Sequence, residues 1–141
     1  GIYSGEIIAM LAGPDPTEVK AGLDAAIRYL ETRALWYSAD AHDGVAFFPH
    51  VVSRIGSYLA SVSGLPQGAP VAYLVAPPLE GSFALDAALK AAAVRIAAYT
   101  APPSETNFMG AIITGEQSAC EAAALAFQEA VLDVAQHPIM Y

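Results

Sequence analysis

Basic residues are scarce in this sequence. Of its 141 residues only 6 are Lys or Arg, against 14 Asp or Glu, which gives a formal net charge of −8 at pH 7. No cluster of Lys or Arg provides the basic stripe that binds phosphate groups, so we expect neither nucleic acid nor a membrane surface as a partner. The charge balance is better suited to a small cationic molecule.

Long apolar runs are also missing. Proline, glycine or a charged residue interrupts every candidate before it reaches the roughly 20 apolar residues that a membrane-spanning helix needs. Hydrophobic residues nevertheless make up 55% of the chain and charged residues only 14%. Because so few charges cannot solvate every face of a monomer in the usual way, the composition predicts association between subunits.

Cysteine occurs once, which excludes an internal disulfide. Cys120 lies in a helical pattern with no His close in sequence, so a buried structural thiol is favoured over a nucleophile. Asp40, His42 and Asp43 resemble metal ligands by composition, but their spacing matches no defined site. Paired carboxylates, a Gly-rich phosphate loop and a His-Glu metal motif are absent from the sequence. We therefore expect no enzymatic activity, no catalytic residue, no cofactor and no metal.

Apolar periodicity and turn residues predict the order of helices and strands. Strands are expected near residues 7–11, 34–39, 71–76, 94–100 and 108–114. Helices are expected near residues 16–31, 49–62, 82–93 and 117–136.

Three of these helices have predicted start signals. Asp15 can cap the first helix, with Pro16 in its first turn. Ser82 can cap the third, and Thr114 with Gln117 resembles a capping box before the last.

One strand-helix unit occurs twice in the chain. GEII at 5–8 leads through a capped turn into the first helix, and GAII at 110–113 leads through another into the last. Both helices carry apolar residues at i, i+3, i+4, i+7, i+8 and i+11, so duplication is favoured over a chance match. A strand, a helix and a strand precede the second copy but not the first. The first copy is therefore expected to be the back half of a domain from a longer parent.

From residue 70 onward, the order strand, helix, strand, Pro-rich loop, strand, Ala-rich helix resembles the bacterial microcompartment (BMC) shell domain. Longer stretches are similar to the L-type shell proteins of ethanolamine-utilisation microcompartments, namely GEIIAMLAGPDPTEVKAGLDA, HVVSRIGSYL, AYLVAPPLEGSFALDAALK, PPSETNF and AVLDVAQHP. The resemblance implies a ferredoxin-like α+β fold, circularly permuted, with helices packed on a mostly antiparallel sheet. It makes residues 1–31 the C-terminal strand-helix half of a first BMC domain, with the front half missing. Residues 32–141 are then a complete permuted second domain.

The same resemblance implies a structural shell protein located in the microcompartment shell in the cytoplasm. Its homotrimers would form pseudohexameric tiles beside other shell proteins, with a gated pore for small metabolites such as ethanolamine. A soluble small-molecule-binding or regulatory module of ferredoxin-like type is the alternative, because it could share the Ala-rich helices and mixed strands.

Two sets of site residues follow from the resemblance. Glu6 and Trp36 match positions that line a small ethanolamine-holding pore within each subunit, together with an Asp from the missing half-domain. The Glu6 carboxylate would pair with the ammonium group, although on its own it is a strand-end charge facing water. A second set matches the loop that borders and gates the central pore, although its composition alone indicates a solvated turn stiffened by prolines. This set is Pro102, Pro103, Ser104, Glu105, Thr106 and Asn107.

Overall fold

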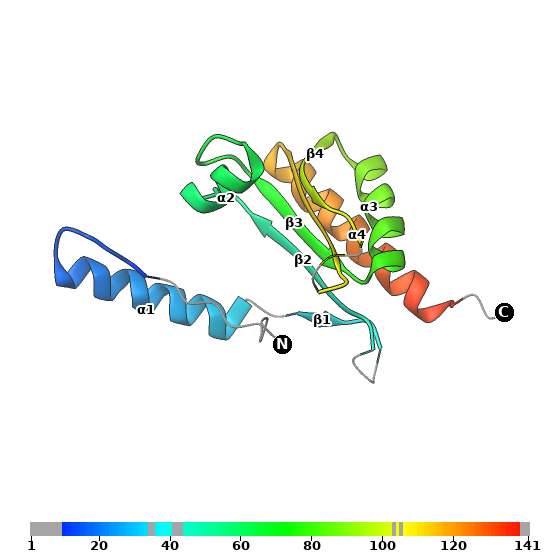
Figure 1. Ribbon diagram of the computed structural model, residues 1–141, viewed down its shortest axis with the longest axis horizontal. Helices are drawn as coiled ribbons and strands as arrows, with labels where there is room; N and C mark the ends of the chain where they lie inside the picture. Colours follow the sequence, from blue (N-terminus) through cyan, green and yellow to red (C-terminus); the bar gives the residue numbers. More distant parts are fainter. Residues whose placement is uncertain (1–9, 34–35, 41–43, 103, 105, 139–141) are drawn as a thin grey trace. The chain divides into compact units, whose positions relative to one another are not determined.

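The computed structural model describes residues 10–33, 36–40, 44–102, 104 and 106–138 (Figure 1). The chain divides into two compact units, Gly1–Leu35 and Trp36–Tyr141, and each is described by itself. Whether they correspond to the back half of one BMC domain and the whole of another stays a prediction.

The first unit contains helix α1, Pro16–Arg33. Asp15 caps it as predicted, because Asp15 Oδ1 accepts hydrogen bonds from the backbone N–H groups of Thr17 at 2.7 Å and Glu18 at 3.0 Å. These bonds satisfy two of the donors that a helix start leaves without partners. Of the strand expected at 7–11, residues 7–9 lie outside the described residues, and Met10 and Leu11 are not in a strand.

The second unit is built on a five-stranded antiparallel sheet with the order β1-β2-β3-β5-β4. This confirms the predicted α+β fold with a mostly antiparallel sheet. The strands are β1 (Tyr37–Ser38), β2 (Ala46–Val52), β3 (Val71–Ala76), β4 (Val94–Thr100) and β5 (Met109–Gly115). The helices are α2 (Ser57–Ser63), α3 (Pro78–Ala91) and α4 (Gln117–Gln136).

Strand alternation gives the sheet two different faces. One face packs against α3 and α4, and its main core includes the fully buried side chains of Phe47, Leu74, Met109 and Phe127. The other face is covered at one end by α2 and the segment before it, through a smaller cluster made by Ile55, Ala60, Val71 and Ile112. In Figure 1, α3 and α4 lie together on one side of the sheet and α2 lies at one end of it.

The helix expected at 49–62 is wrong over its first part. Ala46–Val52 is strand β2, which pairs with β3, and only Ser57–Ser63 is helical. Val51, Val52, Ile55 and Leu59 have helix-like spacing, but Phe47 and Phe48 alternate between the two faces of the sheet. Pro49 is tolerated because β1 is too short to reach it as a hydrogen-bonding neighbour.

Two predicted caps are also wrong. Helix α3 already begins at Pro78, and the Ser82 hydroxyl donates to the Pro78 carbonyl at 2.6 Å within the helix. Thr114 belongs to β5, and its hydroxyl donates to the Pro70 carbonyl at 2.8 Å. The residue that caps α4 is Glu116, through its backbone and not through its side chain.

Candidate functional site

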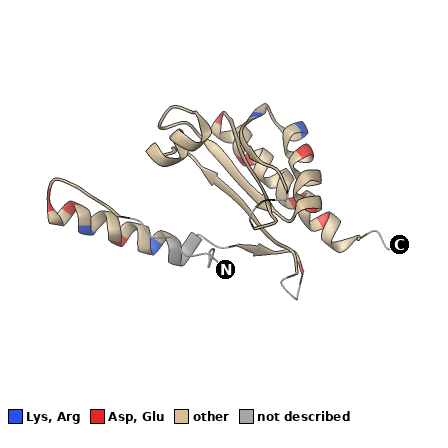
Figure 2. Cartoon of the chain, viewed as in Figure 1, with Lys and Arg blue, Asp and Glu red and all other residues tan. Residues whose placement is uncertain are grey.

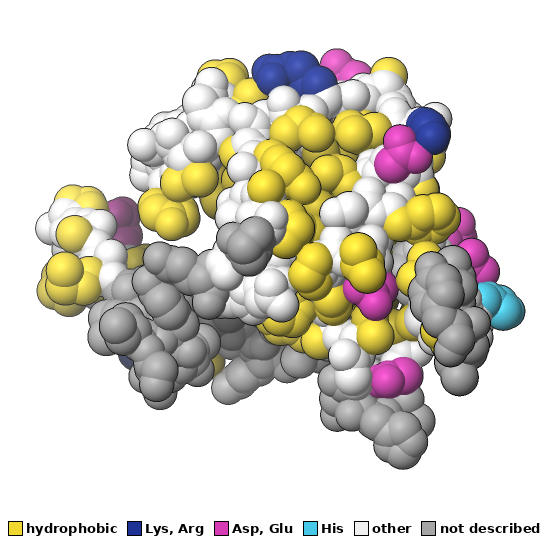
Figure 3. Space-filling view, turned by 45° about the vertical axis from the view of Figure 1, so that its right-hand side comes forward, with side chains coloured by type: hydrophobic (Ala, Val, Ile, Leu, Met, Phe, Trp, Pro, Cys, Tyr) yellow, Lys and Arg dark blue, Asp and Glu magenta, His cyan; other side chains and the backbone are white. Residues whose placement is uncertain are grey.

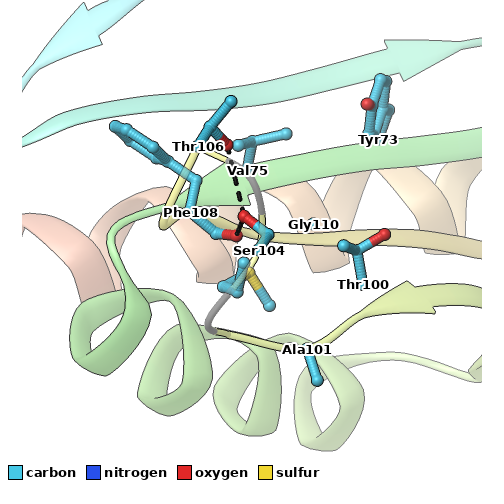
Figure 4. Close-up of a pocket in the computed structure, with 9 residues that line it drawn as sticks. Tyr73, Val75, Thr100, Ala101, Ser104, Thr106, Phe108 and Gly110 are labelled. Atoms are coloured by element: carbon cyan, nitrogen blue, oxygen red, sulfur yellow. Dashed lines mark hydrogen bonds between the residues drawn. The ribbon is translucent and has the colours of Figure 1, made fainter.

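A hollow of about 460 Å³ opens beside the loop that joins β4 and β5 (Figure 4). Tyr73 and Val75 of β3 line it from the sheet, on the face turned away from α3 and α4. Strand β5 contributes Gly110, whose missing side chain leaves room on the floor. The loop and its flanking residues supply the rest of the lining, namely Thr100, Ala101, Ser104, Thr106, Phe108 and Met109.

Ser104 holds the described part of this loop together. Its hydroxyl donates to the Phe108 carbonyl at 2.6 Å and lies 3.3 Å from the Thr106 hydroxyl. Its own carbonyl accepts from the Asn107 N–H at 3.0 Å. Asn107 has a φ of 61°, a left-handed conformation that Asn adopts more easily than most residues. The turn therefore directs the Ser104 and Thr106 side chains toward the hollow, as Figure 4 shows.

The predicted loop set is brought together only in part by the described residues. Pro102 is half-buried, and Ser104 and Thr106 line the hollow. Asn107 forms the turn without lining the hollow. Pro103 and Glu105 lie outside the described residues.

Trp36 belongs to an aromatic cluster near the same loop. Its ring centroid is 5.7 Å from that of Phe48 and 5.6 Å from that of Phe108, although 52% of the residue stays exposed. The ring centroid of Phe48 in turn lies 6.0 Å from that of Tyr73 and 5.2 Å from that of His50. Because Phe108 and Tyr73 also line the hollow, the cluster and the loop form one continuous surface.

Three members of this surface were missed from the sequence. Phe48, Tyr73 and Phe108 come from β2, β3 and the loop, and only the register of the sheet shows that they meet. The adjacent phenylalanines at 47 and 48 were the available signal, but they were expected only to lead into a helix that began near Pro49. Glu6 lies outside the described residues, so its role beside Trp36 stays a prediction.

This face of the sheet carries few charges, and Arg95 of β4 is one of them. Strands β2, β3 and β5 contain no Asp, Glu, Lys or Arg, and Figure 2 shows the charged residues mainly on helices and turns. Burial lowers the pKa of His50, which favours its neutral form. What the surface offers is hydroxyl groups from Ser104 and Thr106 and aromatic faces, which attract cations weakly.

Outside this surface, two predicted features have local structural roles. Cys120 is fully buried, with burial raising the pKa of its thiol, so the prediction of a structural thiol is confirmed. The Asp40 carboxylate accepts from the Gly44 N–H at 2.6 Å and closes a turn, while His42 and Asp43 lie outside the described residues. The described part of the chain contains no group of three His, Cys, Asp or Glu side chains placed to hold a metal. No helix within the described ranges is long and apolar enough to cross a membrane.

Comparison with known proteins places this geometry among shell proteins. Residues 79–139 match the BMC domain family. The chain is 54% identical over 136 residues to the bacterial microcompartment shell protein EutL of Escherichia coli (strain K12), covering 96% of this chain and 62% of that protein.

Solved structures agree with the sequence match. The ethanolamine utilization protein EutL from Leptotrichia buccalis C-1013-b has a TM-score of 0.82 and 54% identity, covering 92% of this chain and 59% of that one. A trimeric bacterial microcompartment shell protein, PduB, has a TM-score of 0.73 and 25% identity, covering 89% and 56%. The chain thus spans about three fifths of the length of these relatives.

Proposed function

Because this chain belongs to the EutL-like BMC-domain proteins, we propose that it is a structural component of a microcompartment shell. The observation that carries this proposal is 54% identity over nearly the whole chain to a protein named as a shell protein. Its place would be the shell of the microcompartment in the cytoplasm, beside other shell proteins. In this role the protein performs no chemical reaction.

Assembly into a homotrimeric tile is the second part of the proposal. One structural relative is itself described as trimeric. The surface of this chain supports association, because large apolar side chains such as Leu79 and Tyr58 are 81% and 77% exposed. Isolated apolar residues on a surface are ordinary, but many of them beside few charges favour burial against another subunit.

The loop at 102–107 is the part of this chain that we assign to the central pore of the tile. A three-fold axis brings three copies of such a loop together, so its hydroxyl groups would line a common opening. Ser104 and Thr106 would then present hydroxyl groups to a passing metabolite, and three copies of Glu105 would favour cations. The hydrogen bond from the Ser104 hydroxyl to the Phe108 carbonyl supports the described part of the loop, and we expect this bond to open if the loop moves to gate the pore.

Ethanolamine is the metabolite we assign to the pore within each subunit, with Glu6 and Trp36 as ligands. A carboxylate pairs with the ammonium group through charge-assisted hydrogen bonds. The exposed face of Trp36 adds a cation–π contact. When the unsubstituted chain is titrated with ethanolamine, the change in Trp36 fluorescence should reach saturation. In the Glu6→Gln variant the same titration should leave the fluorescence unchanged.

Light scattering and electron microscopy over a concentration series test the shell role. A trimer that tiles into flat sheets at higher concentration is the expected result. A stable monomer or dimer at every concentration would contradict it and favour a small, discrete binding module.

A further inference from the structure

Gly110 lies within β5 at a position where the fold gives no reason for a glycine. It pairs with Val75 on β3 and with Thr100 on β4, so a strand flanks it on each side. Its φ lies outside the left-handed region, and an added Cβ would meet only Thr100 Cβ, at 3.9 Å. The packing therefore leaves room for a side chain, which would stabilise the strand. A glycine of this kind is typical of a place where a ligand approaches the backbone closely.

The missing side chain opens a trough that joins two hollows. One is the hollow of about 460 Å³ beside the loop, and the other, of about 80 Å³, continues along β5 toward α2. Tyr73, Thr100 and Gly110 line both of them. Figure 4 shows Tyr73 and Thr100 on the strands at either side of Gly110. We call these three residues, together with Ser104 and Thr106, the hydroxyl trough.

Hydroxyl groups gather in this trough on a molecule rich in hydrophobic side chains, which Figure 3 shows over much of one face. The hydroxyl groups of Tyr73 and Thr100 form no hydrogen bond with any residue that the structure describes, so each can donate or accept. The Ser104 hydroxyl already donates to the Phe108 carbonyl, so it can only accept from a ligand. The described lining of the two hollows includes no charged side chain. A matching ligand both donates and accepts hydrogen bonds and carries no charge.

We propose that the hydroxyl trough binds a neutral small molecule with several hydroxyl groups, a polyol or a monosaccharide. Hydroxyl groups both donate and accept, whereas an ammonium group only donates and a carboxylate only accepts. The rings of Tyr73 and Phe108 offer apolar surface to the carbon chain of such a molecule. Since Ser104 and Thr106 belong to the loop that we assign to the pore, the inference rests on the proposed function for its setting and names a ligand class for that loop.

Titration of the chain with xylitol, a polyol with a hydroxyl group on every carbon, tests the proposal. The amide chemical shifts of Gly110 and Thr106, measured by NMR, should reach saturation with a Kd on the order of millimolar. Pentanol has a carbon chain of the same length with one hydroxyl group, and diaminopentane has it with two ammonium groups. Both should bind at least about fivefold more weakly, because they leave hydroxyl groups of the trough unpaired.

Gly110→Val is the decisive variant, because it fills the trough without removing a polar group. It should abolish the saturable response to xylitol. Its thermal midpoint should stay unchanged or rise by up to about 5 °C, since valine suits a strand better than glycine. Thr100→Val removes one hydroxyl group at nearly constant shape, so it should weaken xylitol binding roughly threefold to tenfold. Ser82→Ala is the matched control, because it removes a hydroxyl group of α3 outside the trough and should leave binding unchanged.

The outcomes separate this inference from the proposed function, because binding is measured independently of assembly. If xylitol gives no saturable response, or if Gly110→Val still binds it, the inference is wrong, and tiling of the chain would still support the shell role. A clearly lower thermal midpoint in Gly110→Val would show that the fold requires this glycine, which also overturns the inference. A stronger response to diaminopentane than to xylitol would make the trough a cation site and overturn the neutral ligand class. A chain that binds xylitol but never tiles would contradict the shell function alone.

Discussion

Replacing Gly81 by Ala tests how closely α3 packs on the sheet. A Cβ at this position would overlap Met109 Cγ and lie 2.8 Å from Met109 Sδ and 3.2 Å from Ala76 Cβ. Met109 and Ala76 are both fully buried, so neither can move out into solvent. The backbone of α3 therefore approaches the sheet at a distance that only glycine permits.

Two opposing effects set the size of the change. Glycine inside a helix is less favourable than alanine by about 1 kcal/mol, which the substitution recovers. Overpacking a filled core costs about 1–3 kcal/mol. Because the clash involves Cγ, near the root of the Met109 side chain, we expect the overpacking to win by about 1–2 kcal/mol in free energy of unfolding.

A double-mutant cycle with Met109→Ala, followed by denaturant unfolding, checks this reasoning. Truncating Met109 removes the obstructing atoms, so Gly81→Ala in that background should stabilise by about 1 kcal/mol. The two backgrounds should thus differ by roughly 2–3 kcal/mol, as expected for side chains in direct contact. An equal effect of Gly81→Ala in both backgrounds would refute the close-packing argument.

Gly22→Ala is the matched control within a helix. Its added Cβ would meet only Leu11 Cδ2 at 3.0 Å, the far end of a side chain that is 47% exposed and free to turn aside. The gain in helix propensity is then unopposed, so α1 should become more stable by about 0.5–1 kcal/mol. Hydrogen exchange of the α1 amides measures it.

Three further substitutions test single interactions. Asp15→Ala removes the cap of α1 and should cost about 1 kcal/mol, seen as faster exchange of the Thr17 amide, and an unchanged exchange rate would contradict the capping role. Ser104→Ala removes the bond to the Phe108 carbonyl and should speed exchange of the Asn107 amide without altering the thermal midpoint, whereas a lowered midpoint would show that Ser104 supports the core. The folded-state pKa of His50 lies below its ordinary value of 6.5, so the unfolded state takes up the proton first and stability falls as pH drops through that value. His50→Gln should make the free energy of unfolding depend less steeply on pH in this range. An unchanged pH dependence would show that other groups cause it.

Local chemistry was enough to predict some elements of the fold. Asp15 and Pro16 are a start signal for α1 within two residues. The continuous apolar run of β3 predicts a buried strand even when its neighbouring strands are unknown. β2 was different, because helical and extended spacing both fit its apolar residues. Only pairing with β3 and the burial of Phe47 in the main core, to 1% exposure, decide between them.

The candidate site also has one part that could be predicted from the sequence and one part that could not. Ser104, Thr106 and Asn107 are neighbours in sequence, so a Pro-rich loop between two strands was recognisable as a unit. The packing of Trp36 against Phe48 and Phe108 joins residues up to 72 positions apart and depends on the register of the sheet. No pattern along the chain contains that register.

The two faces of the sheet explain how one small unit can both fold and present a site. Along β3, Ala72 and Leu74 point to α3 and α4 and are fully buried, whereas Tyr73 points to the opposite face and is 37% exposed. The helices thus supply the burial that stabilises the fold, and the aromatic cluster and loop occupy the face that α2 leaves partly open. Because strand alternation places most of the two sets of side chains on opposite faces, we expect substitutions at the loop to leave the main core packed. In the tile that we propose, the loop and not the main core would then determine which metabolites pass.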